Sequence, residues 1–358
     1  MAKSNDNEIE ILKTIWQRGK GGAWSGHDLQ TISLKPRPGF STDYFKIQDE
    51  MNLMTQSPGQ VMDSFFSTFG MTEFLLRQSI VPIIAWNTGD RRGRCIVTGF
   101  FISASGLLMT AAHVIRDPVD EGYANVSPLG PGVYKLSDDL HFGVMIPANP
   151  AMRNAPPSIF QLPSELRDAR WFMCPFEWAK HWGADVESPL LHEPPQFRLQ
   201  TDIAICKVRE SPLLGPYQPL NIGRHRLNMG DRAAAIGYAE MLDIAFDGTN
   251  EYQPELVVSV GSVTAVHDDN VKEKSNATPG PNFEFNARIP GRMSGSPILV
   301  GSGILTKGVV SRSWQNDNHA SGCLVASVMD LPLIHDQTLV DLMKNGKEGI
   351  VHLVGGDL

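Results

Sequence analysis

Short β-like runs separated by turn residues fill the sequence from Ile80 onward, and they constrain the fold more than any other feature. Many of the runs are rich in Val and Ile, several alternate apolar and polar residues, and Gly, Pro, Asn or Asp tends to stand between them. This pattern favours an all-β sandwich or barrel over an alternating β/α fold. The clearest runs are IVPIIAWN (80–87), RCIVTGFFIS (94–103), DIAICKV (202–208), ELVVSVGSVTAV (255–266) and CLVASV (323–328).

The first 77 residues differ from this β-rich part in the spacing of their apolar residues. Apolar residues recur there at helical spacing, which predicts a small helical segment (1–77) before a main domain of residues 78–358. The segment either binds a regulatory protein or packs on the main domain with no separate role. The helical stretches expected along the chain are 9–16, 45–54, 61–77 and, after the last strand, 333–344.

A less regular, proline-rich region between the β-like runs reads as an insertion (117–198) that contains Trp171, Trp178 and Trp182. Two interpretations are open. The region forms long surface loops that shape a substrate cleft, or its aromatic side chains simply anchor an insertion to the rest of the fold. The second interpretation is favoured.

The composition argues against several classes of protein. A net charge of −8 without any Lys/Arg run gives no basic surface for nucleic acid. The N-terminus lacks the pattern of a signal peptide, and no apolar run reaches the ~18 residues of a membrane span. The four cysteines lie far apart, without metal-site or disulfide-framework spacing. We therefore expect buried free thiols, no metal, no other cofactor and a cytoplasmic location.

Three local patterns carry residues suited to catalysis. Thr110-Ala-Ala-His113 ends an apolar run with an imidazole, and Asp202 stands at the start of the run DIAICKV. The third pattern, Gly-Arg-Met-Ser294-Gly-Ser-Pro, places a serine on a tight turn before an apolar run. A histidine, an acid or a serine of this kind is ordinary when it occurs alone. Together they can supply a nucleophile, a base and an acid that orients the base.

In the order His, Asp, Ser, the strings TAAH, TDIAI and SGSP resemble the trypsin/chymotrypsin-type serine peptidases, over roughly residues 80–345. Ser-Gly-Ser-Pro is similar to bacterial members, including the glutamyl endopeptidases. The resemblance implies two antiparallel six-stranded β-barrels, the first at about 78–210 and the second at about 215–330. It implies a catalytic triad of His113, Asp202 and Ser294, with protein or peptide as substrate.

The resemblance also implies an oxyanion hole made of the backbone N–H groups of Arg292 and Ser294. Arg292 stands where the family usually has glycine, so a left-handed turn there would carry an energetic cost; alternatively, the loop has one extra residue, since a glycine, Gly291, stands one position earlier. Met293 replaces the aspartate that pairs with a new N-terminus in zymogen-activated relatives, and Val114 replaces a disulfide cysteine. Because of Met293, we do not expect activation by insertion of a new N-terminus. Because of Val114, we expect the protein in a reducing compartment.

The resemblance also implies the residues of the substrate pocket, which we place by ungapped counting from Ser294. Arg288, six residues before Ser294, falls at the floor of the primary pocket, and Ser311, Arg312 and Ser313 fall on one wall. Two arginines there would attract a carboxylate, which favours cleavage after acidic residues; alternatively, both arginines face solvent.

The sequence thus predicts a partner-regulated intracellular serine endopeptidase. The alternative is a binding or scaffold protein that keeps the peptidase fold without its activity.

Overall fold

A computed structural model describes most of the β-rich part of the chain and part of what precedes it. The described residues are 9–18, 24–36, 43–47, 51–56, 76–115, 126–130, 133–136, 138–147, 171–184, 198–209, 217–224, 227–245, 254–268, 278–300, 305–314, 318–345 and 348–349.

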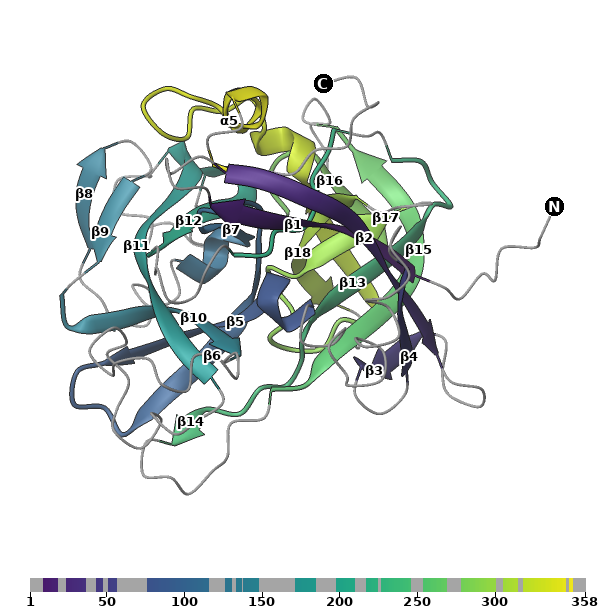
Figure 1. The fold of residues 1–358 in the computed structure, drawn as a ribbon, viewed down its shortest axis with the longest axis horizontal. Helices are drawn as coiled ribbons and strands as arrows, with labels where there is room; N and C mark the ends of the chain where they lie inside the picture. The colour runs from purple at the N-terminus through teal and green to yellow at the C-terminus, as the bar shows by residue number, and fades with distance from the viewer. Residues whose placement is uncertain are drawn as a thin grey trace.

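The first barrel closes six antiparallel strands in the order β10-β5-β6-β7-β12-β11, with β11 paired back to β10. It forms the blue and teal half of the molecule (Figure 1). The hairpin of β8 (Val126–Gly130) and β9 (Val133–Leu136) extends it beside β11, and β14 (Ile244–Ala245) pairs with β6. The barrel strands are β5 (Ile80–Asn87), β6 (Arg92–Phe101), β7 (Leu107–Thr110), β10 (Leu140–Pro147), β11 (Trp171–Ala184) and β12 (Arg198–Val208).

The second barrel closes six antiparallel strands in the order β13-β17-β18-β19-β16-β15, with β15 paired back to β13. Its strands are β13 (Arg232–Tyr238), β15 (Leu256–His267), β16 (Asn282–Phe285), β17 (Pro297–Val300), β18 (Thr306–Trp314) and β19 (His319–Leu324). The predicted fold class, two six-stranded antiparallel barrels, is confirmed.

Two buried clusters stabilise this arrangement. One fills the first barrel and continues into the contact between the barrels, where it includes Ile236 and Val309 of the second. The other fills the second barrel around Phe283 and Phe285. Because apolar burial is the main favourable term in folding, the shared cluster fixes the barrels against each other. Residues that face each other across the barrel contact are therefore held by packed cores on both sides.

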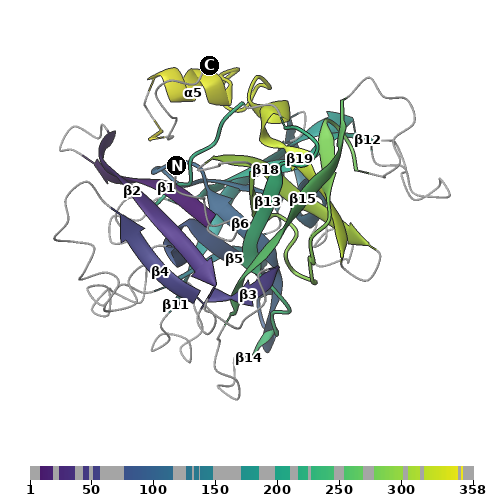
Figure 2. The same cartoon turned by 90° about the vertical axis from the view of Figure 1, so that its right-hand side faces the viewer.

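The N-terminal residues form strands where the sequence predicted helices. β1 (Ile9–Arg18), β2 (Trp24–Pro36) and β4 (Met51–Gln56) make a separate three-stranded sheet outside the barrels (Figure 2). β3 (Tyr44–Lys46) instead pairs with β15 of the second barrel. The helical interpretation of 9–16 and 45–54 is thus wrong, and most of the predicted helix 61–77 lies outside the described residues.

The error has a physical reason in the pattern itself. Ile9 and Ile11 are two residues apart, and both are buried, as is Leu34, the partner of Ile9 on the neighbouring strand. That spacing is the period of a strand, and sheet pairing outweighed the weaker helical spacing of the other apolar residues.

The proline-rich region is not an insertion throughout. It contributes β10 and β11, two of the six strands of the first barrel. Trp171 and Trp182 are buried, and the Trp182 indole donates to the Pro332 carbonyl at 3.0 Å. The anchoring role of these aromatic residues agrees with the favoured interpretation, whereas residues 148–170 and 185–197 lie outside the described part.

A short 3₁₀ helix, η5 (Val325–Val328), follows β19, and the last helix, α5 (Leu339–Asn345), begins later than residue 333. A capping box sets its start. Thr338 accepts the Asp341 N–H through its hydroxyl, and the Asp341 carboxylate accepts the Thr338 N–H. None of the helices in the described residues has both the length and the apolar character needed to span a membrane.

Candidate active site

His113 lies where the first barrel ends one of its strands. β7 stops at Thr110, and a single helical turn over residues 112–115 carries the imidazole. The two alanines before it are fully buried, while the His113 side chain keeps 31% of its surface exposed. The small residues let the turn pack closely on the barrel, so the backbone of His113 is fixed and its ring reaches the surface.

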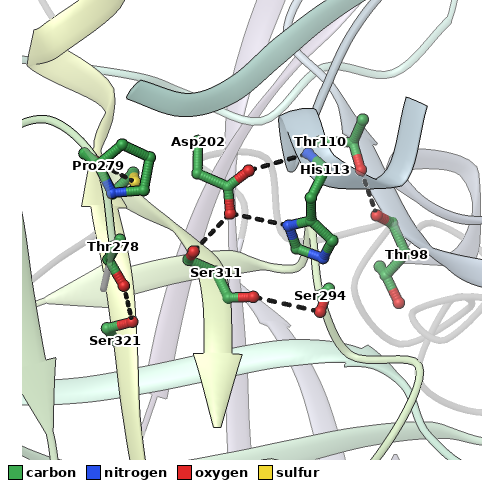
Figure 3. Close-up of polar contacts among 10 residues, drawn as sticks. Thr98, Thr110, His113, Asp202, Thr278, Pro279, Ser294, Ser311 and Ser321 are labelled. Atoms are coloured by element: carbon green, nitrogen blue, oxygen red, sulfur yellow. Dashed lines mark hydrogen bonds and ion pairs between the residues drawn. The ribbon is translucent and has the colours of Figure 1, made fainter. Parts of the chain in front are cut away.

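Asp202 reaches His113 because their strands are neighbours. β12 pairs antiparallel with β7, with Ala204 opposite Thr110, so Asp202 lies beside the turn that follows β7. Its carboxylate binds His113 twice: Oδ2 lies 2.8 Å from ring atom Nδ1, and Oδ1 accepts the backbone N–H at 2.9 Å (Figure 3). The sequence placed this acid before its strand, whereas it lies within β12.

The charge of Asp202 is stabilised in spite of its burial. The carboxylate is only 2% exposed, and burial acts to raise its pKa. The opposing effects are the positive charge that His113 can carry and hydrogen bonds from His113 and Ser311, and together they lower the pKa of Asp202 below its ordinary value. Asp202 is therefore a permanent carboxylate at neutral pH and holds the imidazole in one orientation.

Ser294 comes from the other barrel, on the turn between β16 and β17. Its hydroxyl is partly buried and donates to the Ser311 carbonyl at 3.3 Å. Figure 3 shows the His113 ring between the Asp202 carboxylate and the Ser294 hydroxyl. The three side chains, from two barrels, thus lie next to one another in space, with the imidazole between the hydroxyl and the carboxylate.

Ser311 contributes a contact that the sequence did not predict. We expected it in the wall of the substrate pocket, but it is buried and its hydroxyl donates to Asp202 Oδ2 at 2.5 Å. Its carbonyl accepts the Ser294 hydroxyl. A serine in the string VSRS carries no local signal for this role, because the contact depends on β18 of the second barrel facing Asp202 of the first.

The turn before Ser294 has the geometry of an oxyanion hole. Arg292 adopts the left-handed conformation with a φ of 74°, as expected if it replaces the family's glycine. Among the described residues, neither the Arg292 N–H nor the Ser294 N–H has a hydrogen-bond acceptor. Two unpaired amides two residues apart, one of them on the residue that bears the hydroxyl, are donors available to a developing oxyanion.

Hydrogen bonds on the neighbouring carbonyls orient these amides. The Gly291 carbonyl accepts the Glu240 N–H at 3.0 Å, and the Met293 carbonyl accepts the Ser296 N–H at 3.1 Å. In a trans peptide the N–H points away from the C=O, so each of these bonds directs the N–H on the other side of its peptide plane. The donors are oriented before any substrate binds.

Comparison with known proteins now assigns the chain to a family. The profile of the family described as "Trypsin-like peptidase domain" matches residues 97–306, more than half of the chain. The chain belongs to the trypsin-like peptidase family. It is accordingly a serine endopeptidase, a hydrolase of peptide bonds. No curated protein sequence matches it.

Three solved structures illustrate the similarity of this peptidase to others. Deg5 is 17% identical, with 72% of this chain and 90% of Deg5 covered and a TM-score of 0.41. The active form of the Rv3671c protease from M. tuberculosis is 15% identical, with 78% and 84% covered and a TM-score of 0.36. The HtrA-type protease AlgW, solved with a decapeptide, is 14% identical, with 70% and 63% covered and a TM-score of 0.37.

Of the residues expected in the substrate pocket of the peptidase, Ser311 is buried and the other three are exposed. Arg288 is exposed, and its guanidinium lies over the Tyr44 ring at 4.6 Å from the centroid. It does not lie at the floor of a pocket, because β3 pairs with β15 and presents Tyr44 to it. Arg312 and Ser313, on β18, are exposed.

The other departures from the family pattern are accommodated in the cores of the peptidase. Met293 is fully buried in the apolar cluster of the second barrel, so a thioether packs where an ion pair would otherwise form. The four cysteines are free and buried, and burial raises the pKa of the Cys174 thiol to about 12. These thiols are small apolar side chains of the core, as predicted.

Proposed function

We propose that the chain hydrolyses peptide bonds in protein substrates through a triad of Ser294, His113 and Asp202. The observation that supports this most strongly is the pair of hydrogen bonds by which the ring and the backbone N–H of His113 bind the buried Asp202 carboxylate. An imidazole held in this way directs its other ring nitrogen, Nε2, away from Asp202 and toward the side of the ring where Ser294 lies (Figure 3).

The proposed reaction follows from these positions. Ser294 Oγ attacks the carbonyl carbon of the scissile bond, and His113 Nε2 takes the hydroxyl proton. The imidazolium that forms is stabilised by Asp202, and it then gives its proton to the leaving amine. The amides of Arg292 and Ser294 bind the oxyanion in each tetrahedral intermediate. Water, activated by the same imidazole, hydrolyses the acyl-enzyme and releases Ser294.

Replacing the nucleophile tests this proposal, and the SGSP motif supplies its own control. We expect Ser294→Ala to lower cleavage of a protein substrate by several orders of magnitude while the fold is retained. Ser296→Ala, two residues on, should leave cleavage nearly unchanged, because the buried Ser296 hydroxyl has no hydrogen-bond partner among the described residues. Equal cleavage by Ser294→Ala and the wild type would contradict the proposed nucleophile, whereas no cleavage by the wild type would favour the inactive scaffold.

A preference for acidic residues before the scissile bond remains part of the proposal, now with Arg312 as its source. Arg312 is exposed on the same strand as Ser311, which contacts both Asp202 and Ser294. A guanidinium there can bind a substrate carboxylate through charge-assisted hydrogen bonds. A peptide-library profile dominated by basic or large apolar residues at that position would overturn the preference.

We also propose regulation through residues 1–77 and a cytoplasmic location. The β1-β2-β4 sheet lies outside both barrels, and β3 joins the second barrel next to Arg288, so a protein bound to this region has a structural connection to the peptidase domain. The four buried free thiols suit a reducing compartment. Co-purification of the Ser294→Ala protein with a partner that is lost when β1 is altered tests the first point, and cell fractionation the second.

A further inference from the structure

We infer that Thr98, on β6 of the first barrel, is a positioning residue for the oxyanion-hole turn of the second barrel; this inference rests on the proposed function. Thr98 is fully buried. Its backbone N–H donates to the Ser294 carbonyl at 3.1 Å, and its hydroxyl lies 3.3 Å from the Arg292 carbonyl. The same residue therefore binds the turn on both sides of Met293.

The direction of the hydroxyl bond follows from its partners. The Tyr238 N–H lies 2.9 Å from Thr98 Oγ1 and can only donate, whereas the Arg292 carbonyl can only accept. The Thr98 hydroxyl must therefore accept from Tyr238 and donate to Arg292. The Thr98 hydroxyl thus links the end of β13 to the turn, acting once as acceptor and once as donor.

With the hydrogen bonds from Thr98, every carbonyl of the turn 291–294 has a donor. The carbonyls of Gly291 and Met293 are bound by backbone N–H groups, and Thr98 binds those of Arg292 and Ser294. All four peptide planes across the turn thus have a bound carbonyl, while the two amides that face an oxyanion stay open. Arg292 has a φ of 74°, which a side-chain-bearing residue rarely adopts, so an unbound carbonyl at this residue would let the strained turn relax.

Close packing keeps Thr98 itself in place. The Thr110 hydroxyl donates to the Thr98 carbonyl at 2.8 Å (Figure 3). Gly295, next to the nucleophile, approaches the same carbonyl so closely that an added Cβ would lie 2.1 Å from it. The nucleophile turn therefore rests directly on the Thr98 backbone, and among the described residues the hydroxyl of Thr98 is the side-chain group that binds the Arg292 carbonyl.

The test compares Thr98→Val, which keeps the shape and removes the hydroxyl, with Thr98→Ser, which keeps the hydroxyl. Thr306→Val is the matched control, because Thr306 is equally buried and its hydroxyl has no partner among the described residues. Each variant is titrated with a fluorophosphonate to count active sites. The kcat and KM for a peptide substrate and the Ki of a peptide boronic acid, which forms a tetrahedral adduct on serine, are then measured.

We expect Thr98→Val to lower kcat about tenfold to a hundredfold with little change in KM, less than the ~10²–10³ that follows loss of an oxyanion donor. The Ki of the boronic acid should rise by a similar factor, whereas a role in folding alone would reduce the titrated fraction and leave both constants unchanged. Thr98→Ser should restore most of kcat, and Thr306→Val should match the wild type.

The outcomes separate this inference from the proposed function. If the wild type cleaves and reacts through Ser294 but Thr98→Val has wild-type kcat and Ki per titrated site, the role of Thr98 is overturned and the triad stands. The same holds if Thr98→Ser is as impaired as Thr98→Val. If Ser294→Ala cleaves like the wild type, the proposed function fails first.

Discussion

The first barrel contributes an imidazole and a carboxylate to the candidate site, whereas the second contributes the hydroxyls of Ser294 and Ser311 and the backbone of a turn. In the proposed reaction, His113 and Asp202 act through an imidazole and a carboxylate, and a single substitution can remove either group. In the proposed reaction, the turn at Arg292 and Ser294 acts through backbone amide groups, which no substitution other than proline can delete. The contribution of the first barrel thus depends on residue identity, and that of the turn depends on backbone conformation. We therefore expect substitutions in the two barrels to affect activity and stability differently.

The largest effect should come from the first barrel. Asp202→Asn keeps the size of the side chain but cannot accept the Nδ1 proton in the same way or stabilise the imidazolium. We expect kcat to fall about 10⁴-fold, as in other Ser-His-Asp enzymes, while the protein remains folded. Steady-state kinetics and circular dichroism check the two parts. A loss of less than tenfold in a folded protein would show that Asp202 does not orient His113.

The next largest effect should come from the backbone of the second barrel. Gly295 has a φ of 81°, and an added Cβ would meet the Thr98 carbonyl at 2.1 Å and the Thr110 hydroxyl at 2.2 Å. We expect Gly295→Ala to lower the free energy of unfolding by about 3 kcal/mol, from conformational strain and overpacking together.

Gly230 provides the control for this change. It has a similar φ of 88°, but a Cβ there would meet nothing within 4 Å. Gly230→Ala should therefore cost about 1 kcal/mol, from conformation alone. Chemical denaturation measures both values, and equal losses would mean that the turn does not pack against the first barrel as described.

A smaller effect, of opposite sign, should follow from relieving the strain at Arg292. Its side chain is exposed and its φ is 74°. Arg292→Gly should stabilise the protein by about 0.5 kcal/mol, since glycine tolerates this conformation but gains entropy when unfolded. Because the donor is a backbone N–H, kcat should stay within about threefold of the wild type. A tenfold loss of kcat would show that the guanidinium itself takes part.

The smallest effect should be at Arg288. An exposed cation–π contact with Tyr44 is worth about 0.5–1 kcal/mol, so Arg288→Ala should reduce stability by no more than that. The residue preferred before the scissile bond should not change, whereas Arg312→Ala should weaken a preference for acidic residues. The cleavage preference of each variant is measured with a peptide library, which distinguishes the two arginines. Loss of the acidic preference in Arg288→Ala alone would place Arg288 back in the pocket.

The contrast between the barrels also explains what could be predicted from the sequence. His113, Asp202 and Ser294 stand in short strings whose order is informative, and β-like runs with turn residues predicted the barrels. The left-handed turn was visible as an arginine at a glycine position, and the structure shows it.

The rest depends on contacts between distant segments. Ser311 and Thr98 bind groups from the opposite barrel, and neither is marked by its neighbours in the sequence. Arg288 was misplaced because ungapped counting could not show that Tyr44, from an N-terminal strand, pairs beside it. Of the N-terminal strands that were read as helices, β3 pairs with the distant β15, whereas β1 pairs with the adjacent β2, and there the two-residue spacing of buried residues was overlooked.

The central claim is that one hydroxyl, activated by His113, is the nucleophile, and covalent labelling tests it most directly. The protein is treated with a fluorophosphonate, digested and analysed by mass spectrometry, with His113→Ala processed in parallel. We expect a single stoichiometric adduct on Ser294 in the wild type and labelling slowed by several orders of magnitude in His113→Ala. An adduct on another residue, or equal labelling of the two proteins, would contradict the account.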